Sequence, residues 1–234
     1  MPSADGPEND GVTDPQVAKW TGWIEGAIQR SVIRMNFHRQ IWRGVQQVIQ
    51  ANQQLPPSAY WAYHLEVYVD AQAIAVRRQA DLDARVASLA RLMQQISEEP
   101  ERLTRDWWLQ QWGPEDDDHL SFARGRWATD FGGEIGTHLD PVTAKADLSR
   151  LSAAASSVRT YVNRHVAHSE DLDPDNAPPP AEITLGELDA AIDVIGDLFR
   201  RYLDLLVCVD MDLHVYMSPG WLEPFRQAWI PGSS

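Results

Sequence analysis

Apolar residues recur at steps of three and four along most of the chain, the spacing that places them on one face of an α-helix. The first such segment begins after Asp14-Pro15, a pair that favours a helix start, and continues to about residue 54. Pro56-Pro57 interrupts the pattern. Beyond these prolines the sequence predicts an aromatic-rich helix over residues 59–80 and a third helix over residues 82–98.

The second half of the chain predicts two long helices with matching apolar faces. One follows Asp140-Pro141 and is expected to end near residue 168, and the other follows Thr184, with Glu187 placed to complete a capping box. Their apolar positions step by three and four residues, so the two helices are expected to form an antiparallel pair. Residues 99–140 contain several tryptophans among prolines and glycines, which predicts short helices and an irregular connection.

No stretch alternates apolar and polar residues convincingly enough for a β-strand, and no internal repeat is present. The predicted fold class is therefore all-α, a bundle of four to five main helices with an irregular Trp-rich connection. We expect one domain over residues 15–230. Residues 1–14 carry acidic side chains and no basic one, and they are expected to be disordered.

Charge and cysteine content narrow the class of protein. The formal net charge is −14 among 234 residues, which argues against non-specific coating of nucleic acid. The single cysteine excludes an intramolecular disulfide. No segment is apolar enough to cross a bilayer, and no basic, apolar secretion signal opens the chain. A soluble cytoplasmic protein without a membrane partner is expected.

Basic residues are concentrated in one acidic-poor segment. Between residues 15 and 56 there are five basic residues and one acidic residue, and Arg30 and Arg34 are one helical turn apart, as are Arg39 and Arg43. This segment is either a solvated helix face whose charge balances acidic segments elsewhere in the chain or a basic surface that binds a phosphate-bearing partner. A second basic pair, at residues 77–78, is adjacent in sequence, so its side chains should diverge by about 100° and favour surface charge over a shared site.

Candidate chemistry lies in the last turn of the helix that begins at residue 141. There the chain reads Asn163-Arg164-His165-Val166-Ala167-His168. On a helix with Val162 in the core, residues 161, 165 and 168 share one flank, Asn163 lies on the other, and Arg164 points away from the core. Cations at a helix C-terminus also have a purely structural explanation, because the exposed carbonyls there favour positive charge. His165 and His168 lack an identifiable third ligand, so neither a metal nor another cofactor is expected.

This motif resembles the final-helix signature of HEPN proteins, a group of prokaryotic ribonuclease-like proteins, and the chain as a whole resembles the AbiU2-like branch. The similarity covers about residues 15–230. Its other parts are Arg77-Arg78 with Asp81 and Ser88-Leu89, Glu99-Pro100 with residues 103–105, Thr184-Leu185 with Glu187-Leu188, and a tail from Trp221 to Trp229.

The resemblance implies metal-independent RNA cleavage by a homodimer in which both motifs line a shared cleft. In this reaction the ribose 2′-hydroxyl attacks the adjacent phosphate. Histidine titrates near neutrality and can move a proton, while arginine stabilises charge on a phosphate. His168 matches the family histidine, with Arg164 and Asn163 facing the phosphate. However, the family signature leaves four to six residues between the arginine and the histidine. Asn163 occupies the expected position, five residues before His168, whereas Arg164 leaves only three residues between and Arg159 leaves eight, so neither arginine fits the signature.

Three hypotheses follow from this sequence. The first is an endoribonuclease of the abortive-infection or toxin class, with an RNA substrate and an antitoxin-like partner. The second is a catalytically inactive HEPN-like scaffold that binds a partner protein, an RNA or a small ligand. The third is a structural helical bundle unrelated to HEPN proteins. The acidic, proline-rich residues 169–183 are a further open point, since they could cover the motif as an inhibitory flap.

Overall fold

The long N-terminal helix is built from three consecutive segments. The structure, a computed structural model, describes residues 14–51, 59–113, 117–133, 135–166, 182–214 and 220–221. Helix α1 (Pro15–Trp23) starts where the Asp14 carboxylate accepts a hydrogen bond from the Gln16 backbone N–H at 2.7 Å. It passes through a π-helical turn, η1 (Ile24–Ile28), into α2 (Gln29–Ala51). The expected disordered tail lies outside the described residues, except for Asp14.

Helix α3 (Ala59–Gln79) agrees with the prediction, but α4 (Leu89–Glu98) begins seven residues later than predicted. The reason is local hydrogen bonding. The carboxylate of Asp81 accepts from the Asp83 backbone N–H, and that of Asp83 accepts from the Arg85 N–H, each at 2.9 Å. Such turns compete with helix formation. Ser88 then caps α4 by accepting from the Arg91 N–H, so the prediction of a helix from residue 82 was wrong.

The Trp-rich connection consists of short helices, as predicted. These are η2 (Pro100–Arg102), α5 (Arg105–Gln111), α6 (Asp117–Trp127) and a π-helical turn, η3 (Ala128–Gly132). Trp108 and Trp127 are fully buried, with ring centroids 5.7 Å apart, and both contact Phe131. Burial of these large rings attaches an otherwise irregular segment to the bundle.

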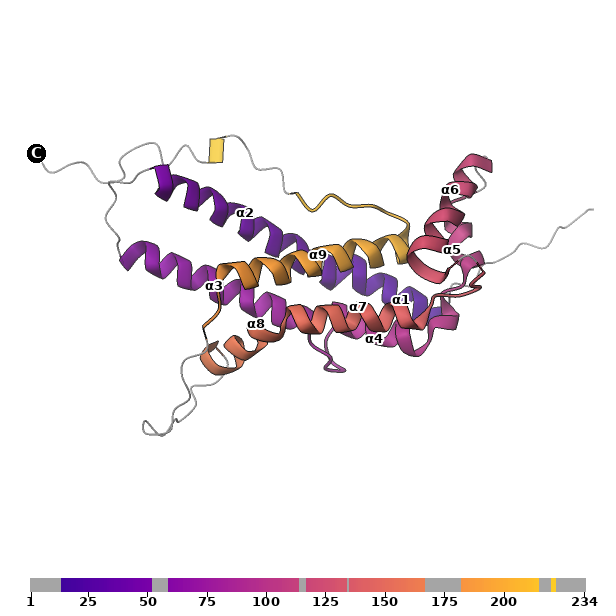
Figure 1. Cartoon of the computed structure of the whole chain (residues 1–234), viewed down its shortest axis with the longest axis horizontal. Coiled ribbons are helices and arrows are strands. Elements are labelled where there is room, and N and C mark those ends of the chain that lie inside the picture. Colours follow the sequence, from indigo (N-terminus) through magenta and orange to yellow (C-terminus); the bar gives the residue numbers. More distant parts are fainter. Residues whose placement is uncertain are drawn as a thin grey trace, which may run out of the picture.

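The last two long helices are neighbours. Helix α7 (Pro141–Ala154) is capped by Asp140, and α9 (Leu185–Val207) by Thr184 with the expected Glu187 capping box. Helices α7 and α9 pack together and run in opposite directions, as Figure 1 shows. The predicted antiparallel pair is therefore confirmed. Helix α9 lies at the centre of the contacts between helices, since it touches α1, α2, α3, α4, α5, α7 and α8.

The prediction of an all-α bundle is confirmed. Figure 1 shows α2, α3 and α9 side by side, with α7 and α4 next to them and α5 and α6 at one end. Within the described ranges no β-strand occurs, and Thr104 and His138 form an isolated antiparallel bridge. None of the helices in this part of the chain combines the length and apolarity needed to traverse a bilayer.

Candidate functional site

The motif lies on a short helical segment that continues α7 after a break. Helix α8 (Ser156–Tyr161) follows Ala155, whose φ and ψ of −87° and 0° interrupt the regular α-helix. A π-helical turn, η4 (Val162–Val166), then carries the motif. The sequence predicted one uninterrupted α-helix here, and this was wrong in detail. The predicted apolar seam is nevertheless buried at Leu151, Ala155, Val158 and Val162, because the core contacts persist across the break.

The η4 turn presents its polar residues to solvent. Val162 is buried at 2% exposure, whereas Asn163, Arg164 and His165 are exposed. Two of the three predicted site residues, Asn163 and Arg164, are therefore on the surface, and His168 lies outside the described residues. π-Helical turns widen the backbone ring and occur frequently at functional sites. The turn thus offers an amide and a guanidinium to a partner from outside.

Tyr161 attaches the motif segment to α3. Its hydroxyl donates a hydrogen bond of 2.6 Å to Asp70 Oδ1, and its ring lies 5.2 Å from that of His165, as expected for a shared flank. Burial, together with the hydrogen bond and the negative charges of Asp70 and Glu66, raises the pKa of Tyr161 to about 12. The phenol therefore stays protonated and can donate throughout the physiological range.

Removing this hydroxyl should loosen the motif segment. Tyr161→Phe is expected to lower the free energy of unfolding by about 1.5–3 kcal/mol, the usual contribution of a hydrogen bond to a charged group. Because the folded-state pKa is above the ordinary 10.0, this contribution is complete below about pH 10 and is lost as the pH rises towards 12. Urea unfolding of both proteins at pH 7 measures the difference. An unchanged midpoint would contradict the role assigned to this bond.

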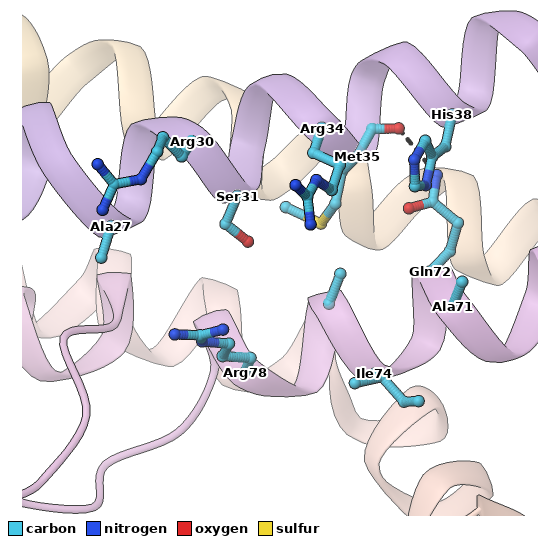
Figure 2. A pocket seen from close by; sticks show the side chains of 11 residues that line it. Ala27, Arg30, Ser31, Arg34, Met35, His38, Ala71, Gln72, Ile74 and Arg78 are labelled. Carbon is cyan, nitrogen blue, oxygen red and sulfur yellow. Dashed lines mark hydrogen bonds between the residues drawn. The ribbon is translucent and has the colours of Figure 1, made fainter.

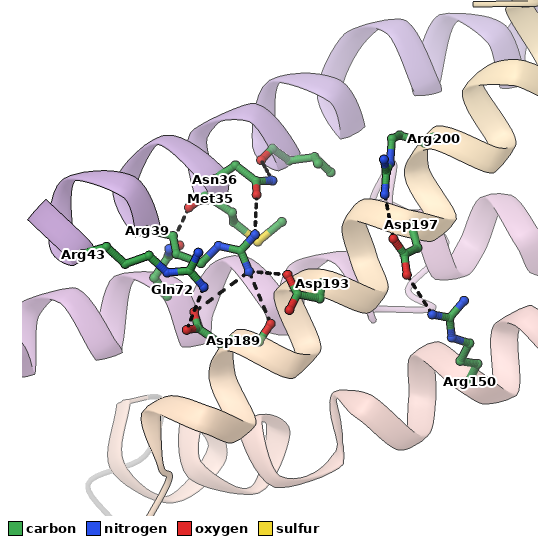
Figure 3. Close-up of polar contacts among 11 residues, drawn as sticks. Met35, Asn36, Arg39, Arg43, Gln72, Arg150, Asp189, Asp193, Asp197 and Arg200 are labelled. Atoms are coloured by element: carbon green, nitrogen blue, oxygen red, sulfur yellow. Dashed lines mark hydrogen bonds and ion pairs between the residues drawn. The ribbon is translucent and has the colours of Figure 1, made fainter. Parts of the chain in front are cut away.

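The basic segment of the sequence divides into two groups with different surroundings. Arg39 and Arg43 belong to the first group, which faces α9 (Figure 3). The Arg39 guanidinium lies 2.5 Å from the Asp193 carboxylate and 2.8 Å from Asn36 Oδ1, and Arg43 lies 3.2 Å from Asp189. These arginines join α2 to α9. For this part of the segment the structure therefore agrees with the first alternative, a helix face that pairs with acidic residues elsewhere in the chain.

The second group surrounds a pocket of about 400 Å³ between α2 and α3, here called the arginine pocket. Figure 2 shows Arg30 and Arg34 projecting from α2 and Arg78 from α3. All three are exposed, and none forms an ion pair within the described part of the chain. Ser31 and His38 also line the pocket, and the described lining contains no acidic residue. Desolvation and the nearby Arg34 lower the pKa of His38.

The arginine pocket adjoins a second cavity, of about 490 Å³, that reaches the motif helix. This motif-side pocket is lined by Arg77, Arg78 and Ile74 of α3, by part of the loop that follows, and by Val162 of η4. Both adjacent arginines line it, so the divergence expected of neighbouring side chains on a helix does not keep them out of one cavity. Asp81 is an acidic residue in its lining, and Arg85 pairs with Asp83 at 2.6 Å. The two pockets share Arg78, so their basic lining extends from α2 across the end of α3 to Val162, the residue before Asn163.

Substitutions should separate the two groups of arginines. Arg39→Ala removes the charge-assisted contacts with α9 and Asn36 from a side chain that is only 13% exposed, so a loss of about 1–2 kcal/mol in unfolding free energy is expected. Arg34→Ala has no ion pair to lose among the described residues and should change stability by less than about 0.5 kcal/mol. Thermal or urea unfolding measures both, and equal losses would contradict this division.

Metal-ligand types are not gathered in the described ranges, where no group of three or more His, Cys, Asp or Glu side chains is placed to hold an ion. The geometry instead combines an exposed amide and guanidinium on η4 with unpaired arginines nearby, an arrangement suited to an anionic partner. Comparison with protein families identifies the family of the chain. The family model described as AbiU2, of the HEPN group, matches residues 27–210. The chain belongs to the AbiU2 family. Comparison with curated proteins and with solved structures returned no match.

The matched range contains the pockets and the motif of this HEPN-like abortive-infection protein. It begins at Ala27, which lines the arginine pocket, and passes through Asn163 and Arg164 to residue 210. Membership in the family overturns the third hypothesis, that of a bundle unrelated to HEPN proteins. Family membership is compatible with both an active and an inactive member.

Sequence reasoning missed two features of the site. Asp70 was not singled out, since it is an acidic residue on an ordinary helix and its partner Tyr161 is 91 positions away. The joint pocket of Arg34 and Arg78 was also missed, because it depends on how α2 and α3 cross. The one available signal was that both arginines lack an oppositely charged residue one turn away on their own helix.

Proposed function

We propose that the chain is a metal-independent endoribonuclease of the abortive-infection type that acts as a homodimer. The observation that carries the proposal is the exposed Asn163-Arg164 turn of a HEPN-family protein, adjoining a surface of unpaired arginines. His168 is assigned to proton transfer, and Arg164 and Asn163 are assigned to the phosphate. Family membership supports the role of His168, which lies outside the described residues.

The proposed reaction needs no group beyond these side chains and the RNA. The ribose 2′-oxygen forms a bond to the adjacent phosphorus while the bond from phosphorus to the 5′-oxygen breaks. A histidine accepts the 2′-hydroxyl proton, and a proton is returned to the departing 5′-oxygen. Arg164 stabilises the charge that develops on the phosphoryl oxygens, and the Asn163 amide donates a hydrogen bond to them. The products are a 2′,3′-cyclic phosphate and a 5′-hydroxyl.

The homodimer is proposed because one motif supplies one histidine assigned to proton transfer, His168, and one guanidinium, that of Arg164. Two copies that face each other would provide one histidine to accept the proton and another to return it. The exposure of η4 supports this arrangement, since a second copy can approach Asn163 and Arg164 without displacing core residues. An antitoxin-like partner protein that covers the same surface would keep such an enzyme inactive.

A catalytically inactive scaffold is the second candidate, and one residue favours it. Asn163 occupies the position where the family places arginine, and asparagine brings no positive charge to a phosphate. Such a protein would bind an RNA, a partner protein or a small ligand at the same surface without cutting the RNA.

Cleavage of a labelled RNA oligonucleotide in the presence of EDTA tests the proposal. We expect cleavage products that end in a 2′,3′-cyclic phosphate and begin with a 5′-hydroxyl, and no cleavage of the same oligonucleotide made with 2′-deoxyribose. Light scattering on the same sample should give twice the mass of the chain. Intact RNA after incubation with a folded dimer would favour the inactive scaffold, and cleavage of the deoxy oligonucleotide would contradict the reaction.

A further inference from the structure

An aromatic pocket of about 370 Å³ lies between α2 and α3. Trp42 of α2 and Tyr68 of α3 stack in its lining, with ring centroids 5.2 Å apart and planes that differ by 16°. The described lining contains no Asp, Glu, Lys or Arg. Two of its large side chains remain in contact with solvent, since Tyr60 is 50% exposed and Val67 is 46% exposed. An exposed apolar surface of this kind usually marks a place where another segment or molecule packs.

The segment that follows α9 runs along α2 in the direction of this pocket. The Gln29 side chain donates a hydrogen bond of 3.8 Å to the sulfur of Met211, and Gln40 Nε2 lies 3.0 Å from His214 Nδ1. Figure 1 shows this segment returning from the end of α9 beside α2. The two contacts have the same order along the segment and along α2, so the chain proceeds towards the C-terminal end of that helix.

Trp221 continues this order and lies next to the aromatic pocket. A Cβ atom at Gly44 would overlap the indole of Trp221, so the glycine lets the ring approach the backbone of α2. Ile41, one helical turn earlier and about 60° around the helix, lines the aromatic pocket, and so does the adjacent Val45. The part of the chain beyond Trp221 therefore starts beside the pocket.

Residues 222–230 have a composition that suits an apolar pocket. Four large apolar side chains occur among these nine residues, and the single acidic and single basic residue cancel in formal charge. Fully extended, nine residues span about 30 Å, which exceeds the diameter of a helix, about 10–12 Å. Residues 1–13 and 167–181, which also lie outside the described ranges, each carry at least three acidic residues and few large apolar ones. Burial of those charges in an apolar pocket would be costly.

We propose that residues 222–230 pack into the aromatic pocket of the same chain, with Phe225 and Trp229 against the ring of Trp61. These two side chains are four residues apart, so they share one side of the segment whether it is helical or extended. Aromatic pairs contribute stability beyond the area that they bury. Trp42 Nε1, a buried donor without a hydrogen-bond partner among the described residues, would donate to a backbone carbonyl of the segment.

A segment in this position touches both helices that form the arginine pocket. His38 and Ala71 line the aromatic pocket and the arginine pocket alike, so the two cavities are continuous. The packed segment would close the aromatic end and hold α2 and α3 at a fixed separation beside the arginines. The contact involves none of the residues assigned to RNA cleavage, so a failed cleavage assay would leave it unaffected.

Disulfide cross-linking of the full-length chain tests the contact. In a Cys208→Ser background, Val67→Cys and Ala228→Cys place one thiol in the pocket lining and one next to Trp229. Mild oxidation should convert at least about half of the protein to a form cross-linked within one chain, identified by non-reducing electrophoresis and peptide mass spectrometry. Val142→Cys with Ala228→Cys is the matched control, since Val142 is also an exposed valine but lies on α7. It should yield less than about a tenth as much.

Thermal unfolding supplies a second measurement, which does not depend on which residues of the segment face Val67. Trp61→Ala and Trp229→Ala should each lower the unfolding midpoint by roughly 3 °C, and the double variant should lose clearly less than the sum, because both changes remove the same contact. Phe122→Ala is the matched control, since Phe122 is an exposed ring on α6 outside the pocket. Its effect should add to that of Trp229→Ala.

A cross-link within one chain supports the proposal. Fully additive shifts of Trp61→Ala and Trp229→Ala, together with no such cross-link, would overturn it. A disulfide that joins two chains would also overturn it and would assign the pocket to the same segment of a second copy. A cross-link within one chain of a protein that leaves RNA intact would uphold the contact and contradict the ribonuclease proposal alone.

Discussion

Asn163→Arg is expected to raise the rate of RNA cleavage by at least about ten-fold, because it places a guanidinium where the charge on the phosphate develops. The substitution restores an arginine five residues before His168, which is the spacing of the family motif. Asn163 is exposed on η4, so the longer side chain needs no space in the core and the fold should tolerate it. Initial rates on one labelled RNA, measured for both proteins at equal concentration, test the prediction.

Asn163→Gln is the matched control for this gain. It lengthens the side chain and keeps the amide without adding charge, so it should cleave at about the wild-type rate. A ten-fold increase in the glutamine variant would assign the effect to side-chain length instead of charge. An unchanged rate in a well-folded arginine variant would show that residue 163 does not face the phosphate, and the site would then need to be rebuilt around Arg164.

His168→Ala should have the opposite effect and abolish both cleavage and any growth arrest caused by overexpression. General acid–base groups contribute about 10²–10⁴-fold to reaction rates, so the residual rate should fall below detection in an ordinary assay. His165→Ala is the matched control on the same turn. The His165 ring is exposed and packs beside Tyr161, so its removal should cause less than a three-fold change in rate, roughly what a surface substitution costs.

Growth arrest is measured from growth curves of cells that express each variant at an equal protein level. Arrest by the wild type and by His165→Ala, together with normal growth of His168→Ala, would agree with the assignment. Equal arrest by His168→Ala would assign the toxicity to another part of the chain. Loss of arrest in His165→Ala alone would move the proton-transfer role to the described part of η4.

The helices that could be predicted from the sequence are those with local signals at their ends. Asp14, Asp140 and Thr184 all cap helices as their sequence context indicates, through hydrogen bonds to nearby backbone N–H groups. Helix α4 was misjudged because Asp81 and Asp83 bind the backbone locally and delay the helix start to Leu89. The apolar pattern alone does not show whether such a turn or a helix is more stable.

The π-helical turns could not be predicted in the same way. A π-helical turn differs from an α-helical turn by one residue in its hydrogen-bond ring, and the buried positions on either side keep nearly the same spacing. Thus Val158 and Val162 were correctly placed in the core, while the turn that carries Asn163 was not anticipated.

Only part of the candidate site could be predicted from the sequence. The motif itself identified Asn163 and Arg164, and the structure exposes both. The basic segment was recognised, but its division was not, because partners of Arg39 such as Asp193, 154 positions away, come from α9. Such ion pairs depend on tertiary packing, and so does the shared pocket of Arg34 and Arg78. Neither produces a periodic pattern in the sequence.

RNA cleavage by the segment Asn163–His168 is tested most directly by comparing purified wild type with His168→Ala in an RNA cleavage assay that contains EDTA. Both proteins should be dimers of equal helical content by light scattering and circular dichroism. The wild type should produce 2′,3′-cyclic phosphate ends, and the alanine variant should produce none. Equal cleavage by both proteins, or none by a correctly folded wild type, would contradict it.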